Sequence, residues 1–483
     1  MPWRCRAKHP AIARARSVER RHSMTRKPLK HRARHQRGAA ALIVVMLLFF
    51  VISLVAAYTS RNLIFEQRTA SNQYRSTQAL EAAEAGLEWA VAQLNAGRVD
   101  ASCTPSTSDT EATHLSFRER HLTVDAGTGT LTPRLADVAM LEAVRAGCVF
   151  NGTRWTCACS LPNQTATALP TVTASGVKPA FIVQFQQPTA LAAGRPQVVE
   201  LQSNSCTRAD PDPSGCLQFS VLRGATGDGV AAVRTLVTLR NAITSVPAAT
   251  LTLGGTLSAL PSGATLTLRN LDTASNGVTL HTAGAAGSVP STGVVRVGLP
   301  GVRPANTMVA GDATLAPAAQ GDFTADDRRF ALFFGMRPST YFRQPGLPTL
   351  DCTSGCNASA INSLLLRNPG RAVWLRGAGT VTLDANVGAA GTPALLIVDG
   401  DIELASGVTV QGLIYQRAKA GGAASNWALS GNSTVEGAVV VEGDLSLGTS
   451  SGGLTLNYAP ALLRQLQVSY GTYVKVPGAW RDF

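Results

Sequence analysis

The stretch AAALIVVMLLFFVISLVAAYTS, residues 39–60, contains no charged side chain. As a helix that rises 1.5 Å per residue it is ~33 Å long, enough to cross a hydrocarbon core of ~30 Å. A basic segment precedes it directly, since residues 1–37 hold 13 Lys or Arg and one acid, Glu19. Basic residues stay on the cytoplasmic side, so we expect one membrane span with an exported C-terminal part. A cleaved signal peptide is the competing interpretation, but its apolar core is normally only about 7–15 residues long.

The helical pattern continues beyond the apolar stretch. Residues 61–96 contain no Pro and one Gly, and Gly97 is a typical residue for a helix stop. Apolar side chains recur at spacings of three and four residues, as on one face of an amphipathic helix. We expect one helix over 39–96, with an apolar first half (39–60) and an amphipathic second half (61–97). The recurring apolar residues are Leu80, Ala83, Leu87, Val91 and Leu94.

The composition of the whole chain excludes several classes of protein. Of 483 residues, 15% are charged and 45% are hydrophobic, which argues against a disordered chain. The net charge of +13 belongs almost entirely to residues 1–37, and the rest of the chain is nearly neutral. A nucleic-acid-binding domain needs basic residues gathered on a folded face. We therefore expect no nucleic-acid partner.

Residues 98–483 have the pattern of a β-rich domain. Short runs of Val, Thr and Leu alternate with Gly, Asn, Asp and Ser, for example FIVQF at 181–185 and TLVTL at 235–239. The expected fold class is α+β: a long N-terminal helix, then a large β-rich domain with disulfides, built as a sandwich or as a β-solenoid. We divide this part into a β-rich exported domain (98–365) and a Gly-rich repetitive region (366–483).

Two weak internal repeats favour the solenoid for the last part of the chain. VDGDIEL at 398–404 is similar to VEGDLSL at 441–447, and VQGLI at 410–414 is similar to VEGAV at 435–439. Short strands punctuated by Gly can stack as the rungs of a solenoid. The spacing of the repeats is irregular, so a β-sandwich remains open.

Eight of the nine cysteines follow the membrane segment, an even number in a compartment expected to be oxidising. Short turn segments favour pairing Cys206 with Cys216 and Cys352 with Cys356. A four-residue loop, 151–154, places Cys148 opposite Cys157, whereas a two-residue loop leaves the two diagonal at ~7–8 Å and hard to bridge. Cys159 is then left for Cys103.

The residues of the exported part do not indicate catalysis. No GxSxG, P-loop or HExxH motif occurs. Cys157 and Cys159 are closer in sequence than zinc ligands usually are, and the Gly-Asp steps at 400–401 and 443–444 lack the dense acidic spacing of calcium loops. We expect no enzyme, no cofactor and no metal site.

The N-terminal segment resembles PilX-type minor pilins of type IV pili. The resemblance covers about residues 36–95 and rests on the following residues: RGAAAL at 37–42, then Glu66, Arg68, Ala70, Asn72, Arg75 and Ala79, and the block EAAEA at 81–85. It implies a prepilin that a prepilin peptidase cuts after Gly38, with Ala39 then N-methylated. It also implies that lipid holds the helix before assembly and that neighbouring pilin helices hold it afterwards.

Two features depart from the usual pilin pattern. The leader has 38 residues, and a start at Met24 would shorten it. Major pilins carry Glu at the fifth mature position, where this chain has Ile43. A carboxylate inside a membrane is costly and usually functional, so its absence favours a low-copy priming or tip subunit over a bulk subunit.

The sequence thus predicts a minor pilin, involved in pilus assembly, adhesion and motility, that is held in the inner membrane by one span. Its C-terminal domain lies in the periplasm and then on the pilus at the cell surface. Expected partners are other minor and major pilins, the prepilin peptidase, the inner-membrane assembly platform and, as a further candidate, a large tip adhesin. Two alternatives stay open: an anchored β protein that binds or degrades polysaccharide, and a minor pseudopilin of a secretion system. The residues expected to act in helix packing and assembly are Glu66, Leu80, Glu84, Leu87 and Val91, and a charge at Leu87 or Val91 is expected to disturb assembly without unfolding the β body.

Overall fold

The computed structural model describes residues 37–108, 114–137, 142–159, 169–172, 177–188, 197–207, 217, 229–448 and 452–482. Two compact units, Met1–Arg68 and Thr69–Phe483, are described separately. Helix α1 (Arg37–Leu94) runs through both and is 58 residues long. It ends two residues before the expected stop because the Asn95 side-chain amide donates to the carbonyls of Val91 (3.1 Å) and Tyr473 (2.7 Å).

In the first unit, the described residues 37–68 form only the first half of α1. Its large apolar side chains, from Leu42 to Phe65, are 50–71% exposed. No other part of this unit among the described residues covers them. Residues 42–60 of the helix are therefore apolar all round, which is the property of a segment that is buried by lipid or by other chains.

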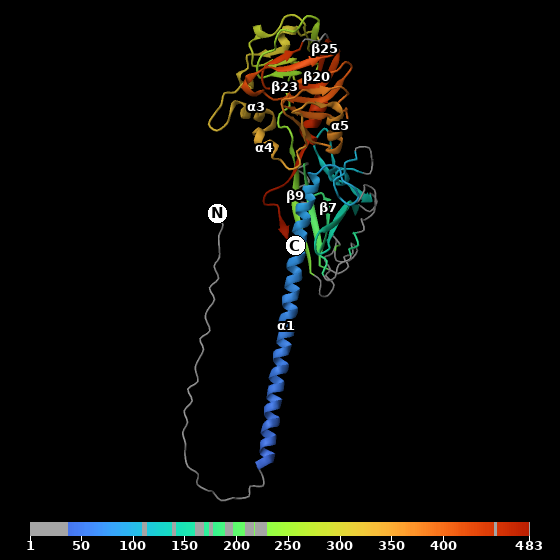
Figure 1. Ribbon diagram of the computed structural model, residues 1–483, viewed down its shortest axis with the longest axis vertical. Helices are drawn as coiled ribbons and strands as arrows, with labels where there is room; N and C mark the ends of the chain where they lie inside the picture. The colour runs from blue at the N-terminus through green and yellow to red at the C-terminus, as the bar shows by residue number, and fades with distance from the viewer. Residues whose placement is uncertain are drawn as a thin grey trace. The chain divides into compact units, whose positions relative to one another are not determined.

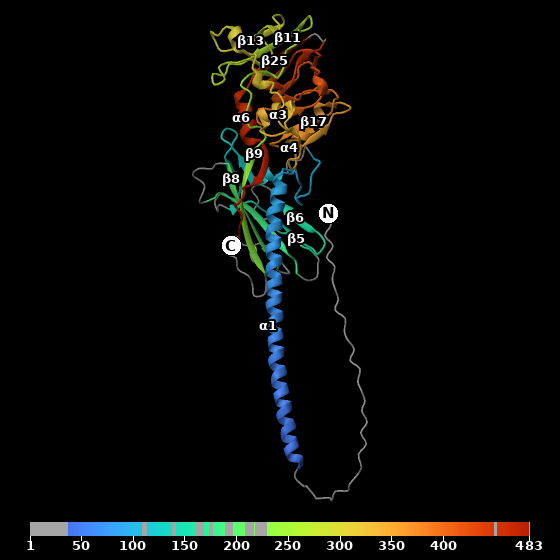
Figure 2. The same ribbon diagram turned by 90° about the vertical axis from the view of Figure 1, so that its left-hand side faces the viewer.

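In the second unit, the second half of α1 lies against an antiparallel sheet, as Figures 1 and 2 show. The order of the strands is β26-β9-β8-β7-β5-β6, and β27 pairs with β9. The last strands of the chain thus pair with a strand from its middle. The bounds are β5 (Arg145–Phe150), β6 (Trp155–Cys159), β7 (Ala180–Gln186), β8 (Val198–Cys206), β9 (Val230–Asn241), β26 (Gly471–Lys475) and β27 (Arg481–Asp482).

Short elements connect α1 to this sheet. Helix α2 (Phe117–His121) begins with a capping box, in which Ser116 and Glu119 satisfy each other's backbone N–H groups. We call the part of the second unit formed by residues 69–241 and 471–482 the head. Its remaining strands are β1 (Leu122–Val124), β2 (Leu131–Pro133), β3 (Leu135–Asp137) and β4 (Glu142–Ala143).

Between β9 and β26 the chain forms a parallel β-solenoid, residues 251–458. One face is a long sheet whose main path is β13-β11-β25-β23-β21-β19-β17-β15, and the opposite face is a short sheet, β16-β18-β20-β22-β24. The strands of the long sheet are β10 (Leu251–Leu253), β11 (Ala264–Arg269), β12 (Leu280–Thr282), β13 (Val294–Val297), β14 (Met308–Ala310), β15 (Thr349–Asp351), β17 (Ala372–Arg376), β19 (Ala394–Val398), β21 (Thr409–Gln416), β23 (Ser433–Val441) and β25 (Gly452–Tyr458). Those of the short sheet are β16 (Cys356–Asn357), β18 (Val381–Leu383), β20 (Ile402–Leu404), β22 (Ser425–Leu429) and β24 (Leu445–Leu447).

The stacking order of the rungs differs from their order in the chain. From β15 to β25 each rung follows its predecessor, but β25 then pairs with β11, and β10 pairs with the end of β23. The early segment 251–310 therefore extends the stack that residues 349–458 build. Three 3₁₀ turns lie in or beside this early segment, η1 (Ala286–Ser288), η2 (Pro304–Thr307) and η3 (Ala313–Leu315), and a fourth, η4 (Ala420–Gly422), precedes β22.

The internal repeats of the sequence coincide with the rungs. Val410 pairs with Val435 and Gly412 with Gly437, directly in register. Gly412 and Gly437 have φ values of 141° and 146°, and a Cβ atom at Gly437 would lie 1.8 Å from the Gly412 carbonyl oxygen. The repeated glycine is required because the backbone of the neighbouring rung occupies the space of a side chain.

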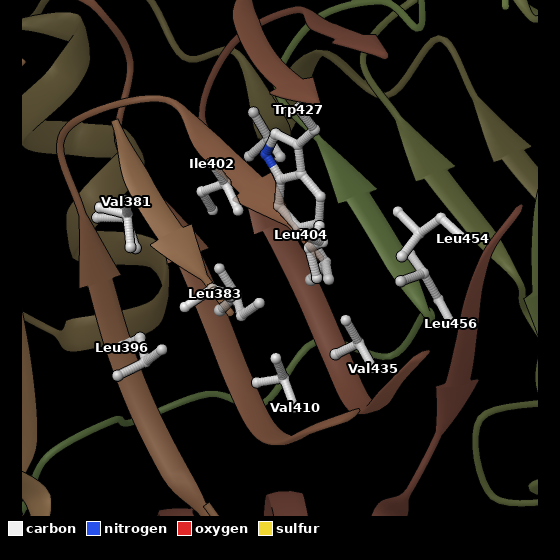
Figure 3. Packing of buried hydrophobic residues seen from close by; sticks show 14 of the residues in the cluster. Val381, Leu383, Leu396, Ile402, Leu404, Val410, Trp427, Val435, Leu454 and Leu456 are labelled. Carbon is white, nitrogen blue, oxygen red and sulfur yellow. The ribbon is translucent and has the colours of Figure 1, made fainter. Parts of the chain in front are cut away.

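The interior of the solenoid is a dry aliphatic core. Figure 3 shows Val381, Leu383, Ile402, Leu404 and Trp427 of the short sheet opposite residues of the long sheet. The facing side chains are Leu396, Val410, Val435, Leu454 and Leu456, all at most 1% exposed. These two facing sheets confirm the expected β-rich fold class. Because their strands pair in parallel, this region is a β-solenoid and not a sandwich.

Four helices complete the second unit. Helices α3 (Ala325–Phe334), α4 (Pro338–Phe342) and α6 (Pro460–Ser469) contribute to a second core on the outer side of the long sheet, around Tyr415 and Trp374. Helix α5 (Ala358–Arg367) buries Ala358 and Ile361 against the solenoid core. The boundary drawn from the sequence at 365/366 falls inside α5.

Candidate functional site

The first part of the site is the apolar half of α1. It is the one helix among the described residues that is long and apolar enough to cross a membrane. Gly38 and Ala39, the expected processing residues, are the second and third residues of α1. Met24 and the rest of the leader lie outside the described residues. Glu66 is exposed on this half of the helix.

The second part of the site is the surface along which α1 packs against the sheet of the head, which we call the seat of the helix. Small side chains let the helix approach closely: a Cβ atom on Gly86 would lie 2.3 Å from Ser203 Oγ. The Ser205 hydroxyl donates to the Ala79 carbonyl, inside the helix. The residues of α1 that are buried in this seat are Ala79, Ala82, Ala83, Gly86, Leu87, Ala90 and Leu94.

This seat corrects part of the sequence interpretation. Leu87 is only 2% exposed and belongs to the core of the head, together with Phe181 and Val233. Val91 is half-buried against the same core. The expectation that a charge at Leu87 leaves the β body intact is therefore wrong, because that side chain packs inside its own chain. The pattern of apolar residues alone did not distinguish packing within the chain from packing between chains.

The face of α1 that points away from the sheet carries the other expected residues. Leu80 is 36% exposed and Glu84 is exposed. Glu84 lines a groove of about 410 Å³. Lys475 and Trp480 of the C-terminal segment form its other wall. Lys475 forms an ion pair with Glu88. The sequence did not suggest this groove, because its two walls are almost 400 residues apart.

Disulfides crosslink both the head and the solenoid. Cys148 and Cys157 are register partners in β5 and β6 with Cα atoms 4.0 Å apart, across a loop of residues 151–154. Cys103 is bonded to Cys159 in the head, and Cys352 to Cys356 in the solenoid. Cys206 is buried and disulfide-bonded. Its expected partner, Cys216, lies outside the described residues.

Buried polar side chains join the head to the solenoid. Arg118 donates to the carbonyls of Leu94 (3.0 Å), Gly370 (3.0 Å) and Gly471 (3.1 Å), which belong to α1, the solenoid and β26. Burial lowers the pKa of this guanidinium from its usual value. The nearby His121 is also buried, which lowers its pKa to about 3, so its imidazole is neutral at physiological pH. Arg118 thus serves the structure of the junction, whereas His121 packs within the head against Phe117 and Phe185.

A second buried polar cluster lies beneath the outer helices of the solenoid. Glu442 accepts hydrogen bonds from the Tyr415 hydroxyl (2.7 Å) and the Ala418 N–H (2.9 Å). Burial raises the pKa of Glu442, while nearby Arg417 opposes that shift. These contacts tie neighbouring rungs together. Within the described ranges, no three His, Cys, Asp or Glu side chains lie close enough to hold a metal ion.

Comparison with known proteins bears on the first part of the site. Residues 37–88 match the model of the PilX N-terminal family, which confirms the resemblance seen in the sequence. The competence-associated pilin ComZ from Thermus thermophilus is a similar solved structure, with 13% identity and a TM-score of 0.21 over 85% of this chain and 97% of that chain. No curated protein matches the chain. The family points to a structural protein, and the long apolar helix found among the described residues fits a single-pass anchor.

Proposed function

We propose that this chain, a type IV pilus-related pilin whose residues 37–88 belong to the PilX N-terminal family, is a low-copy subunit that primes pilus assembly and stands at or near the tip. The observation that carries the proposal is the division of α1. Its first half has exposed apolar side chains throughout, whereas its second half is seated in the head. A simple anchor needs the first half and has no use for a helix that continues into the core of a domain.

The same helix serves two environments in turn under this proposal. Lipid buries the side chains from Leu42 to Phe65 while the subunit waits in the inner membrane, with the head and the solenoid in the periplasm. Neighbouring pilin helices bury them after the leader is removed at Gly38 and Ala39 is methylated. Burying such side chains is worth ~1.5–3 kcal/mol each in either environment, so exchange between the two needs no chemistry by this chain.

Two features support a priming or tip role over a bulk role. Ile43 stands where a major pilin has a carboxylate, so the docking contact that this carboxylate makes to a neighbour's amino terminus is missing. The solenoid adds residues 251–458 to the head, a bulk that suits the end of a fibre. Its surface would be presented outward, with other pilins, the assembly platform and a large tip adhesin as partners. The chain would act by packing and not by catalysis.

The outward face of α1 supplies the contacts to neighbours that we propose for the second half of the helix. Leu80 and Glu84 lie on this face, with Glu66 further toward the N-terminus. Leu87 and Val91 act only indirectly, by seating the helix. A variant of Leu80 should therefore lower the amount of subunit in fibres without lowering the stability of the head.

The test is mass spectrometry of the N-terminus, on protein from sheared surface fibres and from membranes, with and without the prepilin peptidase. We expect a chain that begins at methylated Ala39 in fibres, and an intact leader without the peptidase. Gly38→Val should block this maturation, and Gly38→Ala, the conservative control, should retain part of it. An intact leader in both strains, with all protein in membranes, would reject the pilin role and favour an anchored protein whose solenoid is then tested for polysaccharide binding.

A further inference from the structure

The stack of rungs ends at two strands that pair on one side only. Strand β13 pairs with β11, and β14 pairs with β12. Within the described ranges, no strand pairs with the other edge of either one. Figure 2 shows β13 at the end of the stack, next to β11 and β25. We call residues 294–310, which comprise β13, η2 and β14, the open end. A free strand edge presents backbone N–H and C=O groups that can bind a further strand.

The side chains that the open end directs into the core are incompletely covered. Val294 and Met308 pack against the aliphatic core but are only half-buried. Their register partners on the preceding rung, Leu266 and Leu280, are 0% exposed. The two leucines are fully buried because they have a rung on each side. One further strand would cover Val294 and Met308 in the same way.

The outer side chains of the open end are apolar as well. Val295, Val297 and Val309 are 50%, 39% and 42% exposed. On the preceding rung the same positions carry polar residues, namely Thr267, Arg269 and His281. Strands that are apolar on both faces are typical of the interior of a sheet that is covered on both sides. The exposed valines therefore indicate a surface that another chain buries.

One charged side chain makes the open end selective. Arg296 is half-buried on the inner side of β13, where its Nη1 donates to Met308 Sδ (3.1 Å). Among the described residues it forms no ion pair. Arg303 is the only other charged residue in 294–310, so this rung carries two positive charges and no acid. An inward charge on an edge strand opposes pairing with any strand that brings no opposite charge.

We infer that the open end binds an extended segment of another protein, which adds to the solenoid as one further strand and places a carboxylate beside Arg296. The length of the segment follows from β23, whose nine residues pair with β25 at one end and with β10 at the other. Strands β13 and β14 continue these same two tracks, so one strand of that length can pair with both. Backbone hydrogen bonds supply the affinity of such a contact, and the side chains supply its specificity. A second copy of this chain fits less well, because it would bring a second Arg296 and no acid.

The test uses a fluorescein-labelled peptide of nine residues, VTETGAVTV, designed on the β23 segment STVEGAVVV at 433–441. In the frame of β23 its first and seventh residues, both Val, lie beside Val294 and Met308, and its third residue, Glu, lies beside Arg296. We expect fluorescence anisotropy to detect binding to the full chain in detergent. The same peptide with Lys in third place should bind about tenfold more weakly. A version with N-methylated backbone amides should not bind, because it cannot donate hydrogen bonds to the strand edge.

Three results would overturn the inference. The first is no binding of the Glu peptide at millimolar concentration, or equal binding of the Glu and Lys peptides. The second is binding that survives N-methylation, since no strand is then added. The third is a dimer of the chain in sedimentation that the Glu peptide dissociates, which would assign the open end to a second copy.

A matched pair of variants tests whether the peptide binds at the open end. Arg296→Glu should reverse the preference, so that the Lys peptide binds about tenfold more tightly than the Glu peptide. Arg343→Glu makes the same change of charge at an exposed position outside the open end, and should keep the wild-type preference. If both variants keep that preference, the peptide does not bind at this rung. Should Arg296→Glu fail to fold, Arg296→Gln removes the charge alone and should make the two peptides bind equally. These measurements use the purified chain, so no result depends on whether it is assembled into pili.

Discussion

The head and the solenoid are stabilised by contacts of different range. In the head, β26 pairs with β9, and Asn95 binds Tyr473 across 378 residues of sequence. In the solenoid from β15 to β25, each rung bonds to the one before it. The head should therefore unfold as one cooperative unit. The solenoid should behave more like a sum of rung stabilities and nearest-neighbour terms.

The largest effect is expected in the head, for Leu87→Asp. The side chain is 2% exposed inside the core, so an aspartate there would be a buried unpaired charge. We expect the free energy of unfolding of the head to fall by about 3–5 kcal/mol, followed through the near-ultraviolet signal of Trp89 and through proteolysis. The solenoid should keep its resistance to protease.

Leu80→Asp is the matched control on the same helix. Leu80 is 36% exposed on the face away from the sheet, so the head should lose less than ~1 kcal/mol. In cells this variant should instead reduce recovery in sheared fibres. Equal loss of stability in the two variants would mean that α1 is not seated as described.

The next largest effect is expected at a rung of the solenoid, for Gly437→Ala. The added Cβ would lie 1.8 Å from the Gly412 carbonyl oxygen, so the backbone of two rungs must shift. We expect a loss of about 3 kcal/mol that is confined to the solenoid. Gly443→Ala, where a Cβ meets nothing within 4 Å, should leave the unfolding midpoint nearly unchanged.

The head and the solenoid can also be compared by the loss of stability that follows when one disulfide is removed from each. The Cys148–Cys157 bond closes a separation of nine residues and the Cys352–Cys356 bond one of four. Loop entropy predicts losses of ~2.5 and ~2 kcal/mol for the paired Ser substitutions. Unfolding in urea with separate probes for the head and the solenoid measures both. A loss in the head after removal of Cys352–Cys356 would show that the regions are coupled more tightly than their topology suggests.

The smallest effect concerns the pH dependence of the solenoid. Burial raises the folded-state pKa of Glu442 above its usual 4.5, so this group favours folding below that value and loses its contribution as the pH rises through the raised pKa. Glu442→Gln removes the titration, and we expect the free energy of unfolding to change less between pH 4 and pH 7, by about 1 kcal/mol or less.

The local features of this chain could be predicted from its sequence. The apolar run at 39–60 and the block EAAEA at 81–85 indicated the helix and its similarity to the PilX N-terminal family, because a helix of this kind needs no distant partner to be recognised. The similar segments VQGLI and VEGAV pair position by position, since they form the parallel strands β21 and β23. A four-residue loop at 151–154 was one of the two alternatives open for Cys148 and Cys157, and it is the one that the structure contains.

Features that depend on distant pairing could not be predicted. Nothing in GTYVK at 471–475 indicates that it completes a sheet begun at β5. The early rungs at 251–310 lack the Gly-Asp repeat of the later ones, so their place at the end of the stack was not visible. The burial of Leu87 depends on side chains brought together by that same pairing.

The insertion of the solenoid makes it a detachable module. Gly471 is the register partner of Asn241, so the chain leaves the head and returns to it at neighbouring positions on two adjacent strands. Insertions that begin and end at one point leave the host fold continuous. A short turn in place of residues 242–470 would join β9 to β26 as an ordinary hairpin. The same helix and head could then carry a different inserted domain without any change in their own sequence.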